Sequence, residues 1–170
     1  LDVRKIMDAK KTHNSIVGQY CVDGVCDEAL LQKDGVTILP PEAVLTVPAT
    51  LLVPAALDNQ IRLDNVGSIR ASVLLELANN PVTPEADAEL RKRGVVVIPD
   101  VLANAGGVTV SYFEWVQNRI GESWSEEIIA ERLKHVMLSA WNEVRLLSLD
   151  SGISLRDAAY QLAFKRIADA

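Results

Sequence analysis

Apolar and polar positions divide the chain into two patterns. In the first two thirds, short apolar runs alternate with polar stretches, whereas the last third has helical periodicity throughout. Three of the runs, at 50–53, 72–75 and 95–98, are apolar rather than alternating. Such runs are typical of strands that are covered on both faces in a parallel sheet flanked by helices. The pattern therefore predicts three buried parallel strands.

A helix is predicted between the second and third of these strands. Thr83 can cap its start, and Pro84 fits the first helical position. We expect the helix to run to about Arg93 and to end at Gly94, because glycine is favoured just after a helix. The order strand, helix, strand predicts a doubly wound α/β unit.

The last third of the chain is predicted to be helical. Apolar residues recur at helical spacing after Ser125, which can act as an N-cap. Ser154 and Asp157 resemble a capping box, so we expect a last helix to begin there. The first 48 residues are broken up by glycines, and Pro40 with Pro41 stops any helix. We treat them as a variable lead-in.

Length and charge exclude several classes of protein. A chain of 170 residues is long enough for one well-filled core. Its 17 basic and 23 acidic residues give a net charge of -6, so it lacks the basic surface that binds nucleic-acid phosphates or anionic membranes. No apolar run approaches the roughly 20 residues that span a bilayer. We expect neither a nucleic-acid nor a membrane partner.

The cysteines and histidines indicate no metal site. Cys21 and Cys26 are too few for a disulfide framework or a four-ligand zinc site, and their spacing fits no metal motif. We predict free thiols in a reduced, cytoplasmic setting. His13 and His135 stand apart from other ligand residues. The chain begins without an initiator Met, so we also expect it to be a piece of a longer protein.

The stretch 98–118 is the strongest candidate for chemistry, because it predicts a strand end, a loop of small residues and a helix start. Ligands bind at the carboxyl ends of strands in open α/β sheets. Gly106 and Gly107 would let the backbone approach a flat ring, and Asn104 offers an amide that complements another carboxamide. Ser111 is expected in the first helical turn, where unpaired N–H groups favour a carboxylate.

Four segments resemble glutamate dehydrogenases, in the same order and spacing. The segment ANAGGVTVSYFEWVQN (103–118) is similar to the signature of that family, and the others are PAALDNQI (54–61), ELANNPVTPEAD (76–87) and RDAAYQLAFKRIADA (156–170). The resemblance covers residues 45–170. Related leucine and phenylalanine dehydrogenases share the Asn-Ala-Gly-Gly core but not the continuation SYFEWVQN, so glutamate is the favoured substrate.

The resemblance implies a cofactor and the residues that bind it. Members of the family oxidatively deaminate glutamate to 2-oxoglutarate and pass a hydride from Cα to the nicotinamide of NAD or NADP. Asn104 is then expected to bond the nicotinamide carboxamide, and Asn79 to contact the nicotinamide ribose region. Ala55 and Ala56 are expected to lie against the dinucleotide.

The resemblance also implies two substrate-binding residues. The hydroxyl of Ser111 is expected to meet the side-chain carboxylate of the substrate, and Val108 to form a wall of the same pocket. Such a pocket discriminates against aliphatic substrates, because they would leave the hydroxyl unpaired.

The implied fold class is α/β: a partial Rossmann-like parallel sheet with flanking helices and an all-helical C-terminal segment. Residues 1–48 are expected to be the lead-in of the same domain. Residues 49–125 would be the α/β portion of the dinucleotide-binding domain, and 126–170 would be C-terminal helices packed on it. A half-sheet leaves an unpaired edge, which predicts self-association or cover from the lead-in.

The chain also departs from the family pattern. It has no G-x-G-x-x-G segment for the pyrophosphate and no match to the substrate domain that carries the family's catalytic Lys and Asp. Asn80 replaces the usual glycine after Asn79. We therefore predict the coenzyme-domain portion of a glutamate dehydrogenase, without catalytic residues and inactive alone, from a parent that forms a homo-oligomer. The choice between NAD and NADP stays open.

Two alternatives remain at this stage. The first is a non-catalytic regulatory or assembly module derived from the same domain, which Asn80 and the unmatched lead-in favour. The second is a dehydrogenase for a different acidic amino acid. Separately, Glu76 ends an apolar strand, and a buried carboxylate needs a partner. We expect a structural hydrogen-bonding role for Glu76 rather than catalysis.

Overall fold

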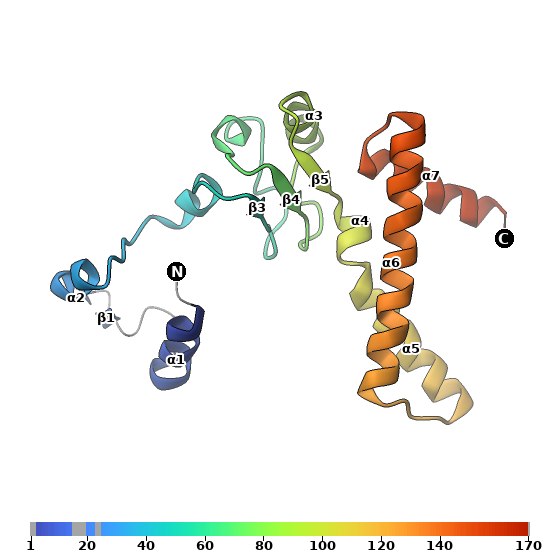
Figure 1. Cartoon of the computed structure of the whole chain (residues 1–170), viewed down its shortest axis with the longest axis horizontal. Coiled ribbons are helices and arrows are strands. Elements are labelled where there is room, and N and C mark those ends of the chain that lie inside the picture. Colours follow the sequence, from blue (N-terminus) through green and yellow to red (C-terminus); the bar gives the residue numbers. More distant parts are fainter. Residues whose placement is uncertain (1–2, 15–19, 23–24, 170) are drawn as a thin grey trace. The chain divides into compact units, whose positions relative to one another are not determined.

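The computed structural model describes residues 3–14, 20–22 and 25–169. The chain divides into two compact units, Leu1–Val44 and Leu45–Ala170, each with its own helices and strands. Figure 1 shows the order of these elements along the chain. All the predicted site residues lie in the second unit.

The first unit is built from short elements: α1 (Val3–His13), β1 (Cys21–Val22), β2 (Val25–Cys26) and α2 (Glu28–Lys33). Asp27 caps α2, because its carboxylate accepts a hydrogen bond from the Leu30 N–H at 3.0 Å. Among the described apolar residues of this unit, only Ala9 is buried. Local hydrogen bonds and one covalent cross-link therefore contribute much of the stability of this unit.

The covalent link is a disulfide between Cys21 and Cys26, so the prediction of free thiols is wrong. Strands β1 and β2 pair antiparallel, and their register sets the two cysteines opposite each other with Cα atoms 4.0 Å apart. Opposite residues of an antiparallel pair project on the same side. A spacing that fits no metal motif thus sets the two cysteines opposite each other across a pair of antiparallel strands. The cytoplasmic setting stays a prediction.

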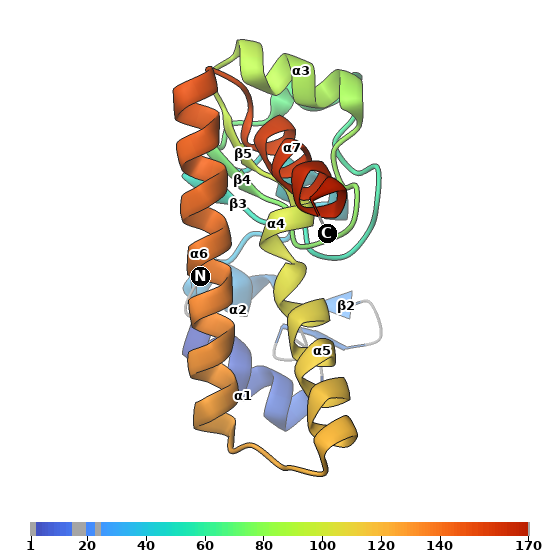
Figure 2. The ribbon, with the colours of Figure 1, turned by 90° about the vertical axis from the view of Figure 1, so that its right-hand side faces the viewer.

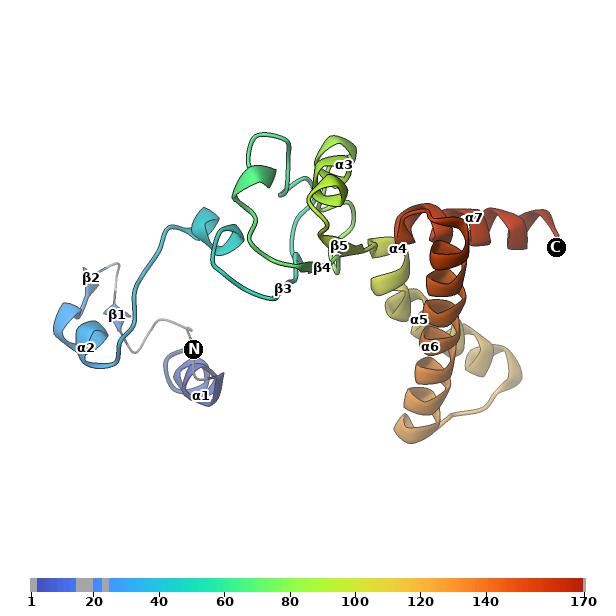
Figure 3. The same ribbon diagram turned by 45° about the horizontal axis from the view of Figure 1, so that its top comes forward.

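The second unit contains a three-stranded parallel sheet in the order β3–β4–β5, visible in Figure 3. Its strands are β3 (Leu51–Leu52), β4 (Val73–Leu75) and β5 (Val96–Ile98). Each strand lies inside a predicted run, and the predicted parallel pairing is confirmed. Leu74 of the central strand is fully buried, as expected for a strand that is covered on both faces. The predicted burial of the other two strands is wrong in part, because β3 and β5 are the outer strands and Leu51 and Val96 on them are each 48% exposed.

Helix α3 (Pro84–Lys92) connects β4 to β5 and has the predicted ends. The Thr83 hydroxyl accepts a hydrogen bond from the Ala86 N–H at 3.4 Å. After Arg93, Gly94 adopts a φ of 74°, the left-handed conformation that glycine takes at little cost. The predicted α/β class with a partial Rossmann-like sheet is thereby confirmed.

Four helices follow β5: α4 (Asp100–Ala103), α5 (Ala105–Ile120), α6 (Glu126–Ser151) and α7 (Leu155–Ala168). Ser125 caps α6 and Ser154 caps α7, both as predicted. Helices α5 and α6 lie side by side (Figure 2). The predicted loop of small residues after β5 is wrong, because the chain is helical from Asp100 onward with an interruption at Asn104.

Two apolar clusters stabilise the second unit. The first joins the sheet to α3 and to η2, a short 3-10 helix (Val66–Ser68). Its buried members are Ile61, Val66, Ile69, Ala71, Leu74, Val82, Ala86, Leu90, Val95 and Val97. The second joins α4, α6 and α7, and its buried members are Leu102, Val144, Ala158 and Ala159. Since α7 also contacts β5, it connects the helical cluster to the sheet.

Strand β3 is an edge strand in the described part of the second unit, and Leu51 on it is 48% exposed. An open edge with an exposed apolar residue supports the predicted self-association or cover from the lead-in, which stays a prediction. None of the helices described is long and apolar enough to cross a membrane.

The disulfide makes a direct prediction. We expect iodoacetamide to modify neither cysteine of the denatured chain without reductant, and to modify both after treatment with dithiothreitol. Mass spectrometry counts the added groups. Closing a loop of this size contributes about 2 kcal/mol by chain entropy, so reduction should also destabilise the first unit.

The double variant Cys21→Ser/Cys26→Ser is the control, because its stability should not respond to dithiothreitol. Two modified cysteines in the unreduced chain would contradict the disulfide.

Candidate functional site

The candidate site begins with two asparagine side chains that the fold brings together. Asn79 lies in the loop after β4, and Asn104 lies between α4 and α5. The Asn104 Nδ2 donates hydrogen bonds to the Asn79 Oδ1 at 2.8 Å and to the Leu77 carbonyl at 3.3 Å. The two predicted cofactor residues are therefore in direct contact at the carboxyl edge of the sheet.

Asn104 keeps an acceptor available. It occupies the N-cap position of α5, yet its side chain makes no capping bond to the helix. Asparagine at an N-cap commonly accepts from a first-turn N–H through its side-chain oxygen. Here the Oδ1 has no hydrogen-bond partner among the residues that the structure describes. A ligand that carries a donor group could occupy it.

The loop after β3 lies next to the loop that carries Asn79. The Pro54 carbonyl accepts hydrogen bonds from the N–H groups of Leu77, at 3.0 Å, and Ala78, at 2.9 Å. Ala55 and Ala56, which follow Pro54, are exposed. The loops after β3 and β4 and the start of α4 after β5 thus lie at one edge, where open α/β sheets bind ligands.

Val108 and Ser111 lie on the same face of α5 as Asn104. The spacings of four and seven residues place all three within about 60° around the helix axis. Val108 is 70% exposed. The Ser111 hydroxyl is also exposed and donates to the Gly107 carbonyl at 3.2 Å. The predicted substrate residues therefore continue the exposed face that begins at Asn104.

The predicted place of Ser111 within the helix is wrong. Because α5 begins at Ala105, Ser111 lies in the second turn rather than the first. Its hydroxyl is one turn beyond the N–H groups that are free at a helix start. An anion bound there would depend on the hydroxyl itself rather than on those N–H groups.

The two glycines of the segment face different surroundings. A Cβ built on Gly106 would lie 3.7 Å from the Leu133 Cδ1 and 3.9 Å from the Met137 sulfur, which is ordinary van der Waals contact with α6. A Cβ on Gly107 would have no atom within 4 Å among the described residues. The folded chain therefore has room for a larger residue at Gly107, beside the exposed face.

Asn80 has the backbone conformation of a glycine. Its φ is 47°, in the left-handed region, and its carbonyl accepts from the Asn59 N–H at 2.9 Å. Asparagine tolerates this region better than other residues with a Cβ. The replacement of the usual glycine at Asn80 is thus compatible with the loop conformation.

A buried ion cluster, absent from the predicted site, lies behind these loops. Arg156, from the first turn of α7, donates to the Glu76 Oε1 at 2.7 Å and to the Asp100 Oδ1 at 3.2 Å. It also lies 3.5 Å from the Asp87 Oδ1. Glu76 is fully buried, and Asp87 and Asp100 are 6% and 7% exposed. The partner that Glu76 was expected to need is Arg156.

Burial and charge act against each other in this cluster. Burial raises the pKa of Glu76 above its ordinary value of 4.5, although the hydrogen bond and charge of Arg156 oppose the shift. Burial alone would lower the pKa of Arg156, but its bond to Glu76 and the three carboxylates together raise that pKa. The guanidinium is thus held in its charged form.

One sequence signal pointed to Arg156. A cation in the first turn of a helix faces the positive end of the helix dipole, which is unfavourable unless acidic partners compensate. Arg156 is such a cation, two positions after the N-cap Ser154. The signal indicates acidic partners but does not identify them.

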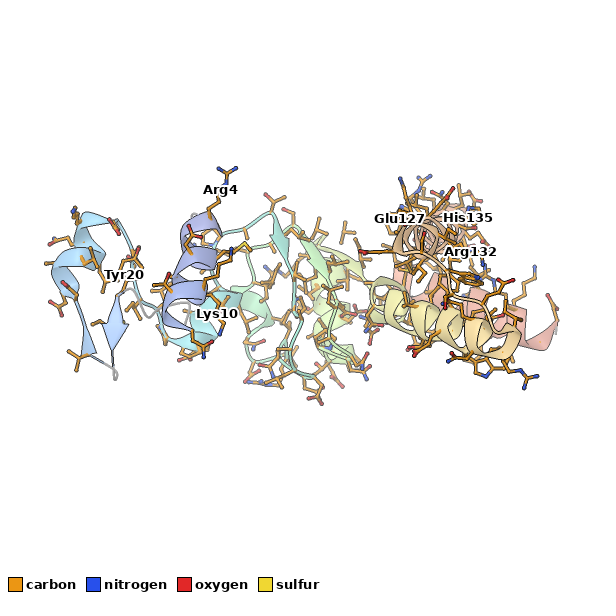
Figure 4. The ribbon with its side chains drawn as sticks, turned by 90° about the horizontal axis from the view of Figure 1, so that it is seen from below. Arg4, Lys10, Tyr20, Glu127, Arg132 and His135 are labelled. Carbon is orange, nitrogen blue, oxygen red and sulfur yellow. A yellow bond between two sulfur atoms is a disulfide. The ribbon has the colours of Figure 1, made fainter. Side chains whose placement is uncertain are left out.

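The remaining candidates lie away from the candidate site. His135 and Arg132, on α6 in Figure 4, line a surface groove with Phe113. The Arg132 guanidinium lies 3.8 Å from the centre of the Trp124 ring. The side chain of His13 is outside the described residues. No group of three or more potential metal ligands occurs in the described part of the chain.

Amides and a hydroxyl can bind and orient a ligand, but they are poor proton carriers at neutral pH. Asn79, Asn104 and Ser111 have the polar groups to bind and orient a ligand, and none of the three can readily carry a proton. Their polar groups match a carboxamide and a carboxylate, the two ligand groups that the sequence predicts.

Comparison with known proteins gives the family. A sequence profile described as Glutamate/Leucine/Phenylalanine/Valine dehydrogenase matches residues 1–170, so the match includes the lead-in as well as residues 45–170. An NAD-specific glutamate dehydrogenase of Staphylococcus aureus (strain COL) is 52% identical over the whole chain, which covers 37% of that protein. An NADP-specific glutamate dehydrogenase of Synechocystis is 39% identical and is covered to 39%.

A solved structure agrees with these relatives. The hetero-hexameric glutamate dehydrogenase of Thermus thermophilus, in a leucine-bound form, superposes with a TM-score of 0.80 at 30% identity. The match covers 99% of this chain and 36% of that one. The chain thus spans about two fifths of the length of the relatives it matches. It belongs to the Glutamate/Leucine/Phenylalanine/Valine dehydrogenase family.

Proposed function

We propose that the chain is the coenzyme-domain portion of a glutamate dehydrogenase, which converts L-glutamate to 2-oxoglutarate with NAD or NADP. The observation that carries the proposal is the contact between Asn79, in the loop after β4, and Asn104, between α4 and α5, at the carboxyl edge of the sheet. The names of the relatives support glutamate as the substrate and a nicotinamide cofactor.

The nicotinamide half of the cofactor fits the residues at this edge. The free Oδ1 of Asn104 can accept from the amide group of the nicotinamide carboxamide. Ala55 and Ala56 have small exposed side chains that let a ribose or ring lie close. When bound, the nicotinamide accepts the hydride from the substrate. Asn79 orients Asn104 and completes the contact on the ribose side.

The substrate fits the continuation of the same helical face. Seven residues separate Asn104 from Ser111, which is about 10 Å along the axis of α5. Contacts to the nicotinamide and to the distal carboxylate of glutamate can therefore come from one rigid helix without overlapping. Val108 lies between them and supplies an apolar contact for the methylene groups.

Chemistry would require the rest of the parent protein. Proton transfer at the substrate Cα needs a poised amine or carboxylate, and the predicted site residues supply neither. We propose that the isolated chain is inactive, and that the parent is a cytoplasmic homo-oligomer. Exposed apolar side chains on α5, α6 and α7 support assembly; they include Tyr112, Trp115, Leu149, Phe164 and Ile167.

The second candidate is a non-catalytic regulatory or assembly module. The glycine-to-asparagine change at Asn80 favours it, because a side chain is added to the loop that carries Asn79. Glutamate-dependent reduction of NAD or NADP by the full-length protein decides between the two functions. Complete absence of that reduction, with glutamate and with other acidic amino acids, would support the module.

Asn104→Ala tests the cofactor contact. In the full-length protein it should weaken NAD(P) binding by about tenfold, the worth of one buried hydrogen bond. Calorimetry measures the affinity. The control is Asn118→Ala at the other end of α5, where the side chain is exposed. Equal cofactor affinity in both variants would refute the role of Asn104.

Ser111→Ala tests the substrate contact. Loss of a hydrogen bond to a carboxylate should raise the KM for glutamate by about 10- to 100-fold, and the KM for the cofactor should change by less than about twofold. Steady-state kinetics give both constants. The control is Ser139→Ala on α6, whose hydroxyl bonds Glu143 at 3.2 Å. A selective loss of cofactor affinity would show that Ser111 has the other role.

Gly107→Ala separates folding from binding. The added methyl group meets open space in the folded chain, so stability should stay unchanged or rise by up to about 1 kcal/mol, since alanine favours helix. If the nicotinamide ring lies against this backbone, cofactor affinity should nevertheless fall. Thermal unfolding and calorimetry measure the two effects.

Gly67→Ala, where a Cβ likewise meets open space, is the matched control. Unchanged cofactor affinity in Gly107→Ala would mean that the ring binds elsewhere.

A further inference from the structure

We propose that Arg156 is a positioning residue of the cofactor site, which fixes the loop of Asn79 through Glu76 and Asp100. The inference rests on the function proposed above for Asn79 and Asn104. Arg156 belongs to α7, the last helix of the chain, and does not itself belong to the exposed binding face.

A path of contacts leads from Arg156 to the loop of Asn79, and it starts with two hydrogen bonds of the guanidinium. Arg156 Nη2 donates to the Glu76 Oε1 at 2.7 Å, and Nη1 donates to the Asp100 Oδ1 at 3.2 Å. The second oxygen of Glu76 accepts from the Asp100 N–H at 2.9 Å. The end of β4 and the start of α4 are therefore joined both directly and through the same cation.

The path then reaches the cofactor loop. The Asp100 Oδ2 accepts from the Asn80 N–H at 2.8 Å. Asn80 is adjacent in sequence to Asn79, whose Oδ1 accepts from Asn104. Hydrogen bonds and the one peptide link between Asn79 and Asn80 thus connect α7 to the amide pair. The bond from the Asn80 N–H to Asp100 also fixes the orientation of this loop relative to the start of α4.

The positive charge of Arg156 is needed because the path runs through two buried carboxylates. The carboxylates of Glu76 and Asp100 are both buried, and both lie within hydrogen-bonding distance of the same guanidinium. Two buried carboxylates repel each other strongly unless a cation lies between them. Asp87 adds a third carboxylate, which also pairs with Arg91 at 3.6 Å. Among the described residues, Arg156 alone makes ion pairs with Glu76 and Asp100.

A double-mutant cycle tests the inference. Arg156→Met leaves the two carboxylates without their cation and should release the Asn80 loop. Glu76→Gln alone places an amide N–H against either Arg156 or the Asp100 N–H, so it should also weaken the loop. In the double variant the amide can accept from the Asp100 N–H and turn its NH₂ into the space left by Arg156. We expect the second change to compensate for the first.

Two measurements follow the cycle. Hydrogen exchange of the Asn80 N–H in the 170-residue chain should speed up by about tenfold in Arg156→Met and return to within about threefold of the original rate in the double variant. In the full-length protein, Arg156→Met should raise the Kd for NAD(P)H by about tenfold and change the KM for glutamate by less than about twofold. The double variant should recover most of the affinity.

The matched control is Arg166→Met. Arg166 is also on α7 and also forms an ion pair, with Glu143 at 2.8 Å, but both side chains are about half exposed. The variant Arg166→Met should leave both the hydrogen exchange of the Asn80 N–H and the cofactor affinity unchanged. The inference would be overturned if Arg156→Met and Arg166→Met had equal effects on exchange at Asn80 and on cofactor affinity. It would also be overturned if the double variant bound the cofactor more weakly than Arg156→Met. An unfolded double variant overturns it as well, because the change Glu76→Gln is meant to remove the need for Arg156.

The outcomes separate this inference from the proposed function. If Asn104→Ala leaves cofactor affinity unchanged, the proposed site is wrong, and with it the link from Arg156 to the cofactor. If Asn104→Ala weakens binding and Arg156→Met does not, the site stands and only the positioning role fails.

Discussion

The arrangement of the second unit depends on one cation among three buried carboxylates. Arg156 brings together the end of β4, the start of α4, helix α3 and the last helix of the chain. A buried pair of this kind adds little net stability compared with apolar packing, but losing one partner is costly. Its structural value is geometric, because a guanidinium donates hydrogen bonds only in fixed directions.

The exposed binding face has a different origin. Its members come from loops and from a helix surface that no other described element covers, so the fold does not need their particular side chains. Loops held on a rigid scaffold are where proteins commonly carry binding residues. This explains why the ion cluster behind the face and the amide pair on it have different chemistry, although only the Asn79–Asn80 loop separates them.

Local signals predicted the fold well. The strands, the caps at Thr83, Ser125 and Ser154, and the stop at Gly94 depend on a few neighbouring residues, and all were found. The small-residue segment was misjudged because tertiary packing of Gly106 on α6 overrides the weak helix preference of glycine. Long-range pairings could not be predicted: Glu76 and Arg156 are 80 residues apart, and the Cys21–Cys26 link needed the hairpin register.

The interruption at Asn104 has a thermodynamic consequence. An asparagine in that place could lower the free energy of the helix by about 1 kcal/mol through its side-chain oxygen. Here the amide turns toward Asn79 instead, and the helix start receives no bond from that oxygen. The folded chain therefore forgoes a local stabilisation at its own surface, and the acceptor that the helix leaves unused stays available to a donor group of a ligand.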